Sequence, residues 1–401
     1  MGDMTTIERD LIARAQAAPL LARTQAWAGV NSGTGNLVGV EQMAALLADA
    51  FAALPGELAL VDASPVEAVG PDGILRVVEH GRHLHLAVRP QAPVQMLLTG
   101  HMDTVYPAGH AFQAVVERGD GTLHGPGTAD MKGGLAIMLA ALEAWEGAAD
   151  AARVGYEVVI NSDEETGSLS SSWLIAQAAR SKLAALTYEP ALADGTLAGA
   201  RGGTGNFSLV VRGRAAHAGR NPHEGRNAVV ATADLAVRLA AADIPSLTVN
   251  PARIDGGGPN NVVPDLAVLR VNFRPQSAAA IEAAASLIDE LAADTRERHD
   301  VQIDIHGSFN RPPKPLDAGA ERLFACVADA GARLGQPIAW KATGGVCDGN
   351  NIAACGVPVV DTMGARGGAI HSPDEYLVID SLAERAALSA LVIARIAEGR
   401  W

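Results

Sequence analysis

Apolar and polar positions alternate with two different periods along the first half of the chain. Helical spacing of apolar residues runs through about 4–25, 40–53, 131–146 and 170–181. Short apolar runs that are typical of strands lie at about 74–79, 83–88, 94–99, 154–163 and 183–190. Strands that alternate with helices in this way predict an α/β sheet covered by helices on both faces.

The pattern changes at about residue 204. Two helical segments are interleaved there with several strands, which predicts a small α+β unit of ferredoxin-like character at 204–312. The Pro-rich segment FNRPPKPLD then indicates a hinge back into the first domain. A chain of 401 residues also exceeds the size at which one hydrophobic core stops growing. We therefore expect two domains, one built from 1–203 and 313–401 and one inserted at 204–312.

Composition and charge argue against several classes of protein. The formal net charge is −14 and no Lys/Arg cluster occurs, so we expect neither a nucleic-acid partner nor an anionic membrane surface. The three cysteines (Cys326, Cys347 and Cys355) lack CxxC spacing, which indicates reduced thiols. Charged residues interrupt the apolar stretches of the N-terminal segment, so neither a signal peptide nor a membrane span is expected there. These features predict a cytoplasmic protein.

Ionisable side chains follow several of the expected strands at the point where each strand ends. His101 and Asp103 come directly after an apolar run, and Asp130 stands where a helix begins. Further positions of this kind are Asp163, Glu164 and Glu165 in NSDEETGS, Glu189 in TYEP and His371 in GGAIHSPDEY. Ligands collect at the carboxyl ends of strands in an α/β sheet. Imidazole and carboxylate groups suit zinc, and one bridging Asp with two carboxylates and two histidines would satisfy a pair of zinc ions.

Each of these positions alone also has a structural interpretation. A single histidine such as His101 is commonly a hydrogen-bonded structural residue, and Asp130 could cap the helix that follows it. Three adjacent acids in a row commonly form a solvated loop. A nucleotide-phosphate site is disfavoured, because GPGTADMKGG lacks a Lys followed by Ser or Thr.

Six ordered motifs together resemble one family of enzymes. The segments GHMDTV, GTADMKGG, SDEETGS, YEP, GRAAHAG with NPHEGRNAV, and AIHSPDEY resemble the co-catalytic di-zinc peptidases, which include bacterial glutamate carboxypeptidase, aminoacylase and the acetylornithine and succinyl-diaminopimelate deacylases. The resemblance runs through nearly the whole chain. It implies a zinc-peptidase-like mixed sheet flanked by helices, with 204–312 as a lid or dimerisation domain of a homodimer.

The resemblance also assigns metal ligands. It implies that His101 and Glu189 hold one Zn2+, that Glu165 and His371 hold the other, and that Asp130 bridges both. Co2+ or Mn2+ could take the place of zinc, because affinity order does not settle occupancy. Asp103 would accept the imidazole N–H of His101 and orient it. The peptide bond between Asp130 and Met131 is expected to be cis.

Further residues acquire expected roles in catalysis and binding from the same resemblance. Glu164 would be the general base and acid that takes a proton from zinc-activated water and returns it to the leaving amine. His217 would stabilise the oxyanion in the partner subunit's site. Asn261 and Arg274 would bind the substrate carboxylate, helped by backbone N–H groups near Gly344 and Gly345. Cys347 departs from many relatives, which have Ser, Thr or Gly there.

The expected reaction is hydrolysis of an amide bond next to a free carboxylate, as in glutamate carboxypeptidase. Glu rather than Asp at position 189 favours the carboxypeptidase and deacylase branches of the family. An N-acyl-amino-acid deacylase of the acetylornithine or succinyl-diaminopimelate type is the alternative, so the substrate is a small peptide or an N-acyl amino acid. A catalytically silent dimeric binding protein is a remote alternative, which the intact Glu164 and the complete ligand set disfavour.

Overall fold

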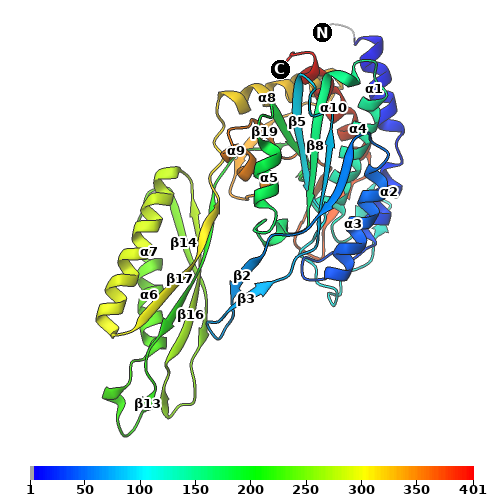
Figure 1. The fold of residues 1–401 in the computed structure, drawn as a ribbon. Coiled ribbons are helices and arrows are strands. Elements are labelled where there is room, and N and C mark those ends of the chain that lie inside the picture. The colour runs from blue at the N-terminus through cyan, green and yellow to red at the C-terminus, as the bar shows by residue number, and fades with distance from the viewer. Residues whose placement is uncertain (1–3) are drawn as a thin grey trace.

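A six-stranded sheet forms the centre of the larger domain in this computed structural model, which describes residues 4–401 (Figure 1). Its strands lie in the order β1 (Glu57–Val61), β4 (His83–Val88), β8 (Val154–Asn161), β5 (Val94–His101), β9 (Ala184–Thr187) and β19 (Val359–Val360). Strands β8, β5, β9 and β19 run parallel, while β4 runs antiparallel to its neighbours β1 and β8. The carboxyl ends of the parallel strands therefore meet at one edge of the sheet.

Helices cover both faces of this sheet because successive side chains of a strand point to opposite sides. Leu98 of β5 packs in the same core cluster as α4 (Gly133–Glu146) and α10 (Asp380–Ala397), whereas Leu97 packs with α5 (Ser172–Ala179) and α9 (Asp348–Ala354). Further α-helices of this domain are α1 (Thr6–Ala17), α2 (Leu20–Ala28), α3 (Leu37–Phe51) and α8 (Ala318–Arg333). The predicted fold class, a mixed α/β sheet flanked by helices, is confirmed.

Shorter β-structures complete the larger domain. A five-stranded sheet has the order β10 (Ala191–Leu192), β20 (Arg366–Gly368), β21 (Tyr376–Val378), β7 (Thr122–His124) and β6 (Val116–Glu117). A parallel pair consists of β11 (Leu197–Arg201) and β18 (Trp340–Thr343), in which Ala198 lies opposite Lys341. The loop between β20 and β21 carries His371.

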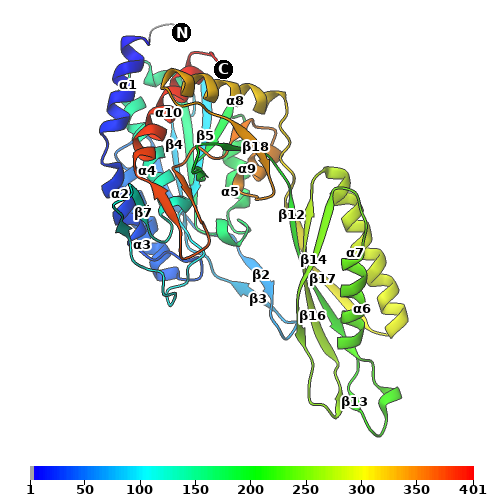
Figure 2. The ribbon, with the colours of Figure 1, turned by 180° about the vertical axis from the view of Figure 1, so that it is seen from behind.

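The inserted unit lies beside the larger domain and has its own apolar core (Figures 1 and 2). Its elements are β12 (Thr204–Arg212), α6 (Ala228–Ala240), β14 (Leu247–Gly256), β16 (Leu266–Pro275), α7 (Ala278–His299) and β17 (Gln302–Arg311). The strands form an antiparallel sheet in the order β14-β16-β12-β17, and both helices pack on one face of it. This βαββαβ arrangement is ferredoxin-like. A short pair, β13 (Ala216–His217) with β15 (Val262–Val263), lies at the end remote from the larger domain.

A β-hairpin of the larger domain reaches across to the inserted sheet (Figure 2). It consists of β2 (Val66–Val69) and β3 (Leu75–Val78). Val69 packs there with Val210 and Val268, whose neighbours along β12 and β16 point to the opposite face and pack with α6 and α7. Near the turn, Nη2 of Arg212 donates a hydrogen bond of 2.8 Å to the carbonyl of Gly73. The hairpin therefore contacts the face of the inserted sheet that the helices leave free.

One predicted element differs in the structure. The helical pattern over about 4–25 forms two helices, because α1 ends at Ala17 and α2 begins at Leu20. A proline disfavours helical conformation in the residue before it, and Ala18, which precedes Pro19, is extended with φ −64° and ψ 151°. Within residues 4–401, none of the helices is both long enough and apolar enough to cross a membrane.

Candidate metal centre and substrate pocket

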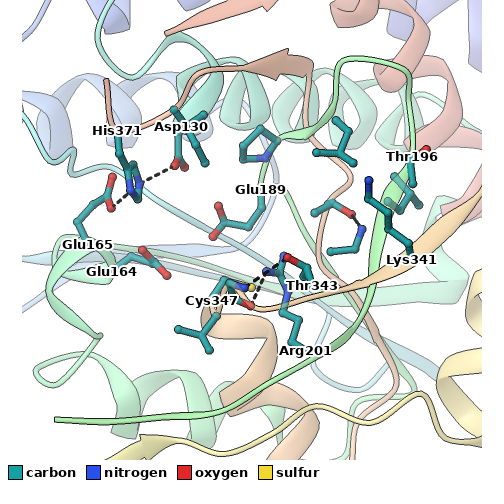
Figure 3. A pocket seen from close by; sticks show the side chains of 18 residues that line it. Asp130, Glu164, Glu165, Glu189, Thr196, Arg201, Lys341, Thr343, Cys347 and His371 are labelled. Atoms are coloured by element: carbon teal, nitrogen blue, oxygen red, sulfur yellow. Dashed lines mark hydrogen bonds and ion pairs between the residues drawn. The ribbon is translucent and has the colours of Figure 1, made fainter. Parts of the chain in front are cut away.

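Ionisable residues gather at the carboxyl edge of the central sheet (Figure 3). His101 is the last residue of β5, and Glu189 follows β9 by two residues. Glu164 and Glu165 lie in a short helical turn (Glu164–Thr166) just after β8. Because β5, β8 and β9 are parallel neighbours, their register brings these segments together at one end of the sheet.

Asp130 lies between the two histidines. Its Oδ1 is 3.1 Å from Nε2 of His101, and its Oδ2 is 3.2 Å from Nε2 of His371. Asp130 does not cap α4, because Lys132 holds the N-cap position of that helix and no side chain caps it. The peptide bond between Asp130 and Met131 is cis. The cis bond implied by the sequence resemblance is therefore confirmed.

The predicted ligands form one continuous cluster. Glu165 Oε2 lies 3.2 Å from Nε2 of His371, and Glu189 Oε2 lies 3.8 Å from Nε2 of His101. Two overlapping groups place one ligand atom from each member within 4.8 Å of the others: His101 with Asp130 and Glu165, and His101 with Glu164 and Glu189. The second group contains Glu164, the residue to which the sequence resemblance assigns proton transfer.

Burial and charge make this cluster a fitting place for divalent cations. Burial raises the pKa of the Glu189 carboxyl to about 7, since water no longer solvates its charge. Hydrogen bonds with Asp130 and Glu165 raise the pKa of His371 to about 11. Several buried carboxylates at such short range repel one another unless a positive charge compensates them. The donor set of carboxylate oxygens and imidazole nitrogens is also one that zinc accepts.

Asp103 joins the ends of two strands beneath the cluster. Nδ1 of His101 lies 3.0 Å from the backbone oxygen of Asp103 and 3.4 Å from its Oδ1. The same carboxylate accepts the backbone N–H groups of Glu164 and Glu165, each at 3.2 Å, and the hydroxyl of Thr34 at 2.7 Å. Asp103 therefore holds the imidazole and the two glutamates in a fixed relation.

Glu375 supports the segment that carries Asp130. Its Oε1 accepts the backbone N–H groups of Ala129 and Asp130 at 3.1 and 3.2 Å, and its Oε2 accepts the hydroxyl of Tyr106 at 2.9 Å. Burial raises the pKa of this carboxyl to about 7. Sequence reasoning missed Glu375, although it stands in the same AIHSPDEY motif as His371.

Arg311 pairs with Glu164. Its Nη2 lies 2.8 Å from Oε1 of Glu164 and donates to the backbone oxygen of the same residue at 3.0 Å. The same nitrogen lies 3.4 Å from Oδ1 of Asp348. Burial raises the pKa of Glu164 well above its usual range, and the charge of Arg311 opposes that rise. Sequence reasoning interpreted FNRPP only as a hinge and therefore missed this contact.

A pocket of about 280 Å³ opens beside the metal cluster (Figure 3). Arg201 lies in its wall and forms a bidentate ion pair with Asp361, with Nε to Oδ2 at 2.7 Å and Nη2 to Oδ1 at 3.1 Å. Its Nη1 donates to the carbonyl of Gly345 at 3.0 Å. Cys347 is buried in the same wall, and burial raises the pKa of its thiol well above the usual range. The thiol is therefore held in its neutral form.

A second groove of about 350 Å³ lies between the cluster and the inserted sheet. It shares Glu164, Glu165 and His371 with the pocket and extends to Arg274. Nε of Arg274 donates to Oδ1 of Asn272 at 2.7 Å. Gly345 lines both hollows, while Gly344 precedes it and lines neither. The N–H of Gly345 donates to the hydroxyl of Thr343 at 3.3 Å.

Two predicted residues lie far from this cluster within one chain. His217 belongs to β13, and the backbone oxygen of Asn261 accepts the N–H of Ala218 at 2.9 Å, so both residues lie at the remote end of the inserted unit (Figure 1). His217 is exposed and is not among the groups of potential ligands found in residues 4–401. A role for His217 in this chemistry would need a second subunit.

Comparison with known proteins gives one family match and close relatives. The model of peptidase family M20/M25/M40 matches residues 97–395. Carboxypeptidase G2 of Pseudomonas sp. (strain RS-16) is 30% identical over 315 residues, which cover 76% of this chain and 74% of that protein. Succinyl-diaminopimelate desuccinylase of Verminephrobacter eiseniae (strain EF01-2) is 27% identical over 307 residues, which cover 72% of this chain and 75% of that protein.

A solved structure supports the same architecture. An M20 family metallo-carboxypeptidase from Sulfolobus solfataricus superimposes with a TM-score of 0.73, covering 95% of this chain and 99% of that one. The sequence identity is 14%, so this likeness concerns the fold alone.

Proposed function

Because the chain belongs to peptidase family M20/M25/M40 and is a hydrolase of that family, we propose that it cleaves an amide bond next to a free carboxylate, as a glutamate carboxypeptidase does. The observation that carries this proposal is the groove beside the ligand cluster, which both Glu164 and Arg274 line. A general base and a carboxylate-binding guanidinium around one space suit a substrate whose scissile amide adjoins a carboxylate.

Two divalent cations would be held by the cluster. His101 and Glu189 would bind one, Glu165 and His371 the other, with Asp130 between them, which agrees with the short distances of Asp130 to both histidines. Zinc suits these donors, and Co2+ or Mn2+ are alternatives. A bound pair of this kind supplies Lewis acidity for the scissile carbonyl and lowers the pKa of a bound water.

Glu164 would move the proton. Its carboxylate lies at the cluster, and burial raises its pKa, which favours a group that both accepts and donates a proton. In this proposal Glu164 accepts a proton from the attacking water and donates it to the leaving amine, while Arg311 fixes the carboxylate through Oε1.

Arg274 would bind the substrate carboxylate. Nε of the guanidinium donates a hydrogen bond to Asn272, and neither Nη1 nor Nη2 has a partner among residues 4–401. Both Nη groups are therefore available for a bidentate contact with a ligand. Gly345 lies at the same groove, although its own N–H is bonded to Thr343.

A homodimer would complete the site. His217 and Asn261 cannot serve the cluster of their own chain from the remote end of the inserted unit. We infer that a partner subunit brings them to the substrate, where His217 would stabilise the oxyanion. The inserted unit would then act as the dimerisation domain.

A deacylase that acts on N-acyl amino acids remains the second candidate, because the relative from Verminephrobacter eiseniae is a desuccinylase and the same machinery serves both reactions. A silent binding protein is the remote candidate. The test is hydrolysis by the zinc-loaded protein of N-acyl amino acids and of peptides with C-terminal Glu, Asp or neutral residues, with and without chelator. Chelator-sensitive release of a free amino acid supports the hydrolase, and the best substrate separates the two candidates. Two bound metals with no turnover on the whole panel would contradict the proposal.

A further inference from the structure

The pocket beside the cluster is largely apolar, and the side chain of Lys341 lies at the end away from the cluster. Leu192, Leu197, Val346 and Ile370 contribute to its walls. Lys341 of β18 lies on the side opposite His371 and Glu165, as Figure 3 shows. An acyl chain that enters the pocket from the cluster would therefore pass apolar side chains before it reaches the Lys341 ammonium.

Only one of the two cations in this pocket is available to a ligand. Every nitrogen of the Arg201 guanidinium is engaged, by Asp361 and by the carbonyl of Gly345. Asp361 carries a second ion pair with Lys314 at 3.0 Å. Lys341, in contrast, has neither an ion pair nor a side-chain hydrogen bond among residues 4–401.

Asp194 is an acidic side chain that competes for this ammonium. Hydrogen bonds from Thr196, and to a smaller extent the charge of Lys341, lower the pKa of Asp194. Asp194 is exposed, does not line the pocket and forms no ion pair with Lys341. Water therefore screens its attraction to Lys341, and the ammonium remains available to a carboxylate in the pocket.

The pocket and the groove meet at the cluster. Both are lined by Glu164, Glu165 and His371, but only the groove reaches Arg274 and only the pocket reaches Lys341. If the carboxylate of the leaving amino acid binds Arg274, the acyl group on the other side of the scissile bond enters the pocket. This step rests on the function proposed above.

We propose that Lys341 is a specificity-determining residue and that the pocket selects acyl groups that end in a carboxylate, so that preferred substrates are mono-amides of short dicarboxylic acids with an amino acid. Hydrolysis of such a substrate adds water across the carbon–nitrogen bond. The products are a free dicarboxylic acid and a free amino acid.

Two substrates of equal size test the proposal. N-glutaryl-L-glutamate carries the terminal carboxylate, and N-(4-carbamoylbutanoyl)-L-glutamate has an uncharged amide in its place. We expect Lys341→Met to lower kcat/KM for the acid about tenfold, which corresponds to roughly 1.4 kcal/mol, and to leave the amide substrate nearly unchanged. Lys341→Arg should keep most of the preference. Arg118→Met, which removes another exposed cation outside the pocket, should change neither substrate. Equal effects of Lys341→Met on both substrates, or no effect on either, would overturn the proposal.

A binding measurement separates this inference from the function on which it rests. Titration calorimetry of the metal-loaded protein compares glutarate with pentanoate, which has one carboxylate fewer. Wild-type protein should bind glutarate about tenfold more tightly, and Lys341→Met should lose that difference. This result would stand even if no amide were hydrolysed, in which case only the proposed reaction fails. Equal affinity of the wild-type protein for the two acids would reject the role of Lys341 whether or not the enzyme turns over.

Discussion

Arg311 is bonded through one nitrogen both to the carboxylate of Glu164, at 2.8 Å, and to the backbone oxygen of that residue, at 3.0 Å. Arg311 ends β17 at the border of the inserted unit, whereas Glu164 follows β8 in the central sheet. The contact therefore couples the junction of the two domains to the group that we assign to proton transfer.

Removal of the Arg311 charge should weaken both folding and turnover. Arg311→Met leaves Glu164 and Asp348 as buried carboxylates without their cation, a change that typically costs about 3–5 kcal/mol. We expect a lower urea midpoint and a lower kcat. Arg311→Lys should recover part of both, since it restores the charge without the planar fork. Unchanged stability of Arg311→Met would show that the pair does not hold the junction.

Glu164→Gln should separate proton transfer from metal binding. The substitution keeps the size of the side chain and removes the base, so kcat should fall by about 10²- to 10⁴-fold. Bound metal, measured by elemental analysis after gel filtration, should stay near the wild-type amount. Glu165→Gln is the matched control. It should lose metal, because Glu165 is proposed to bind a cation together with His371, which it contacts. Substantial turnover by Glu164→Gln would remove this residue from the mechanism.

Asp103→Asn should lower the affinity for metal without changing a proposed ligand. The carboxylate lies 3.4 Å from Nδ1 of His101 and accepts the N–H groups of Glu164 and Glu165. Loss of such an orienting carboxylate commonly costs about 10–100-fold in metal affinity. Competition with a fluorescent chelator measures the change. Asp120→Asn, in an exposed turn, serves as control, and equal affinities of the two variants would count against the orienting role.

Removal of metal should destabilise the protein as well as inactivate it. The buried carboxylates of the cluster repel one another without cations, and a ligand bound only by the folded state adds about 2.7 kcal/mol at a concentration of 100 Kd. Scanning calorimetry should show a lower Tm after dialysis against chelator, and zinc should restore Tm and activity together. A Tm that does not respond to chelator and zinc would argue against a metal centre in the folded protein.

Asn272 should act through Arg274. Its amide donates to Thr204, Gly205 and Asn206, which fixes Oδ1 towards Nε of Arg274. Asn272→Leu should raise KM roughly fivefold for substrates with a free carboxylate and leave kcat nearly constant, since one hydrogen bond contributes about 1 kcal/mol. The C-terminal carboxamide analogues should be unaffected. Asn250→Leu, on the neighbouring strand, is the control, and a rise in KM for both substrate types would indicate a general distortion instead.

Local patterns predicted much of the fold and the cluster. Apolar runs marked β5, β8 and β9, and the polar residues that end them meet because the strands are parallel neighbours. The division of the first helical segment at Pro19 was missed, although proline is a local signal. Local signals thus located the strand ends, and the interruption at Pro19 was also within their reach.

The supporting contacts were beyond local patterns. Glu375 bonds to the backbone of Asp130, 245 positions away, and Arg311 bonds to the backbone of Glu164, 147 positions away. No sequence pattern links the two partners of either contact, because such contacts depend on how distant segments pack. The positions of His217 and Asn261 at the remote end of the inserted unit likewise emerge only once β13 and β15 are paired.

The hairpin of β2 and β3 limits how the two domains can move. Two chain crossings at β12 and β17 alone would let the inserted unit swing freely about one axis. The hairpin adds a third point of attachment, and a large swing would break the bond of Arg212 to Gly73 and expose Val69, Val210 and Val268 to water. The hairpin therefore opposes a large change in the width of the groove between the domains, because such a change would cost this hydrogen bond and this apolar burial.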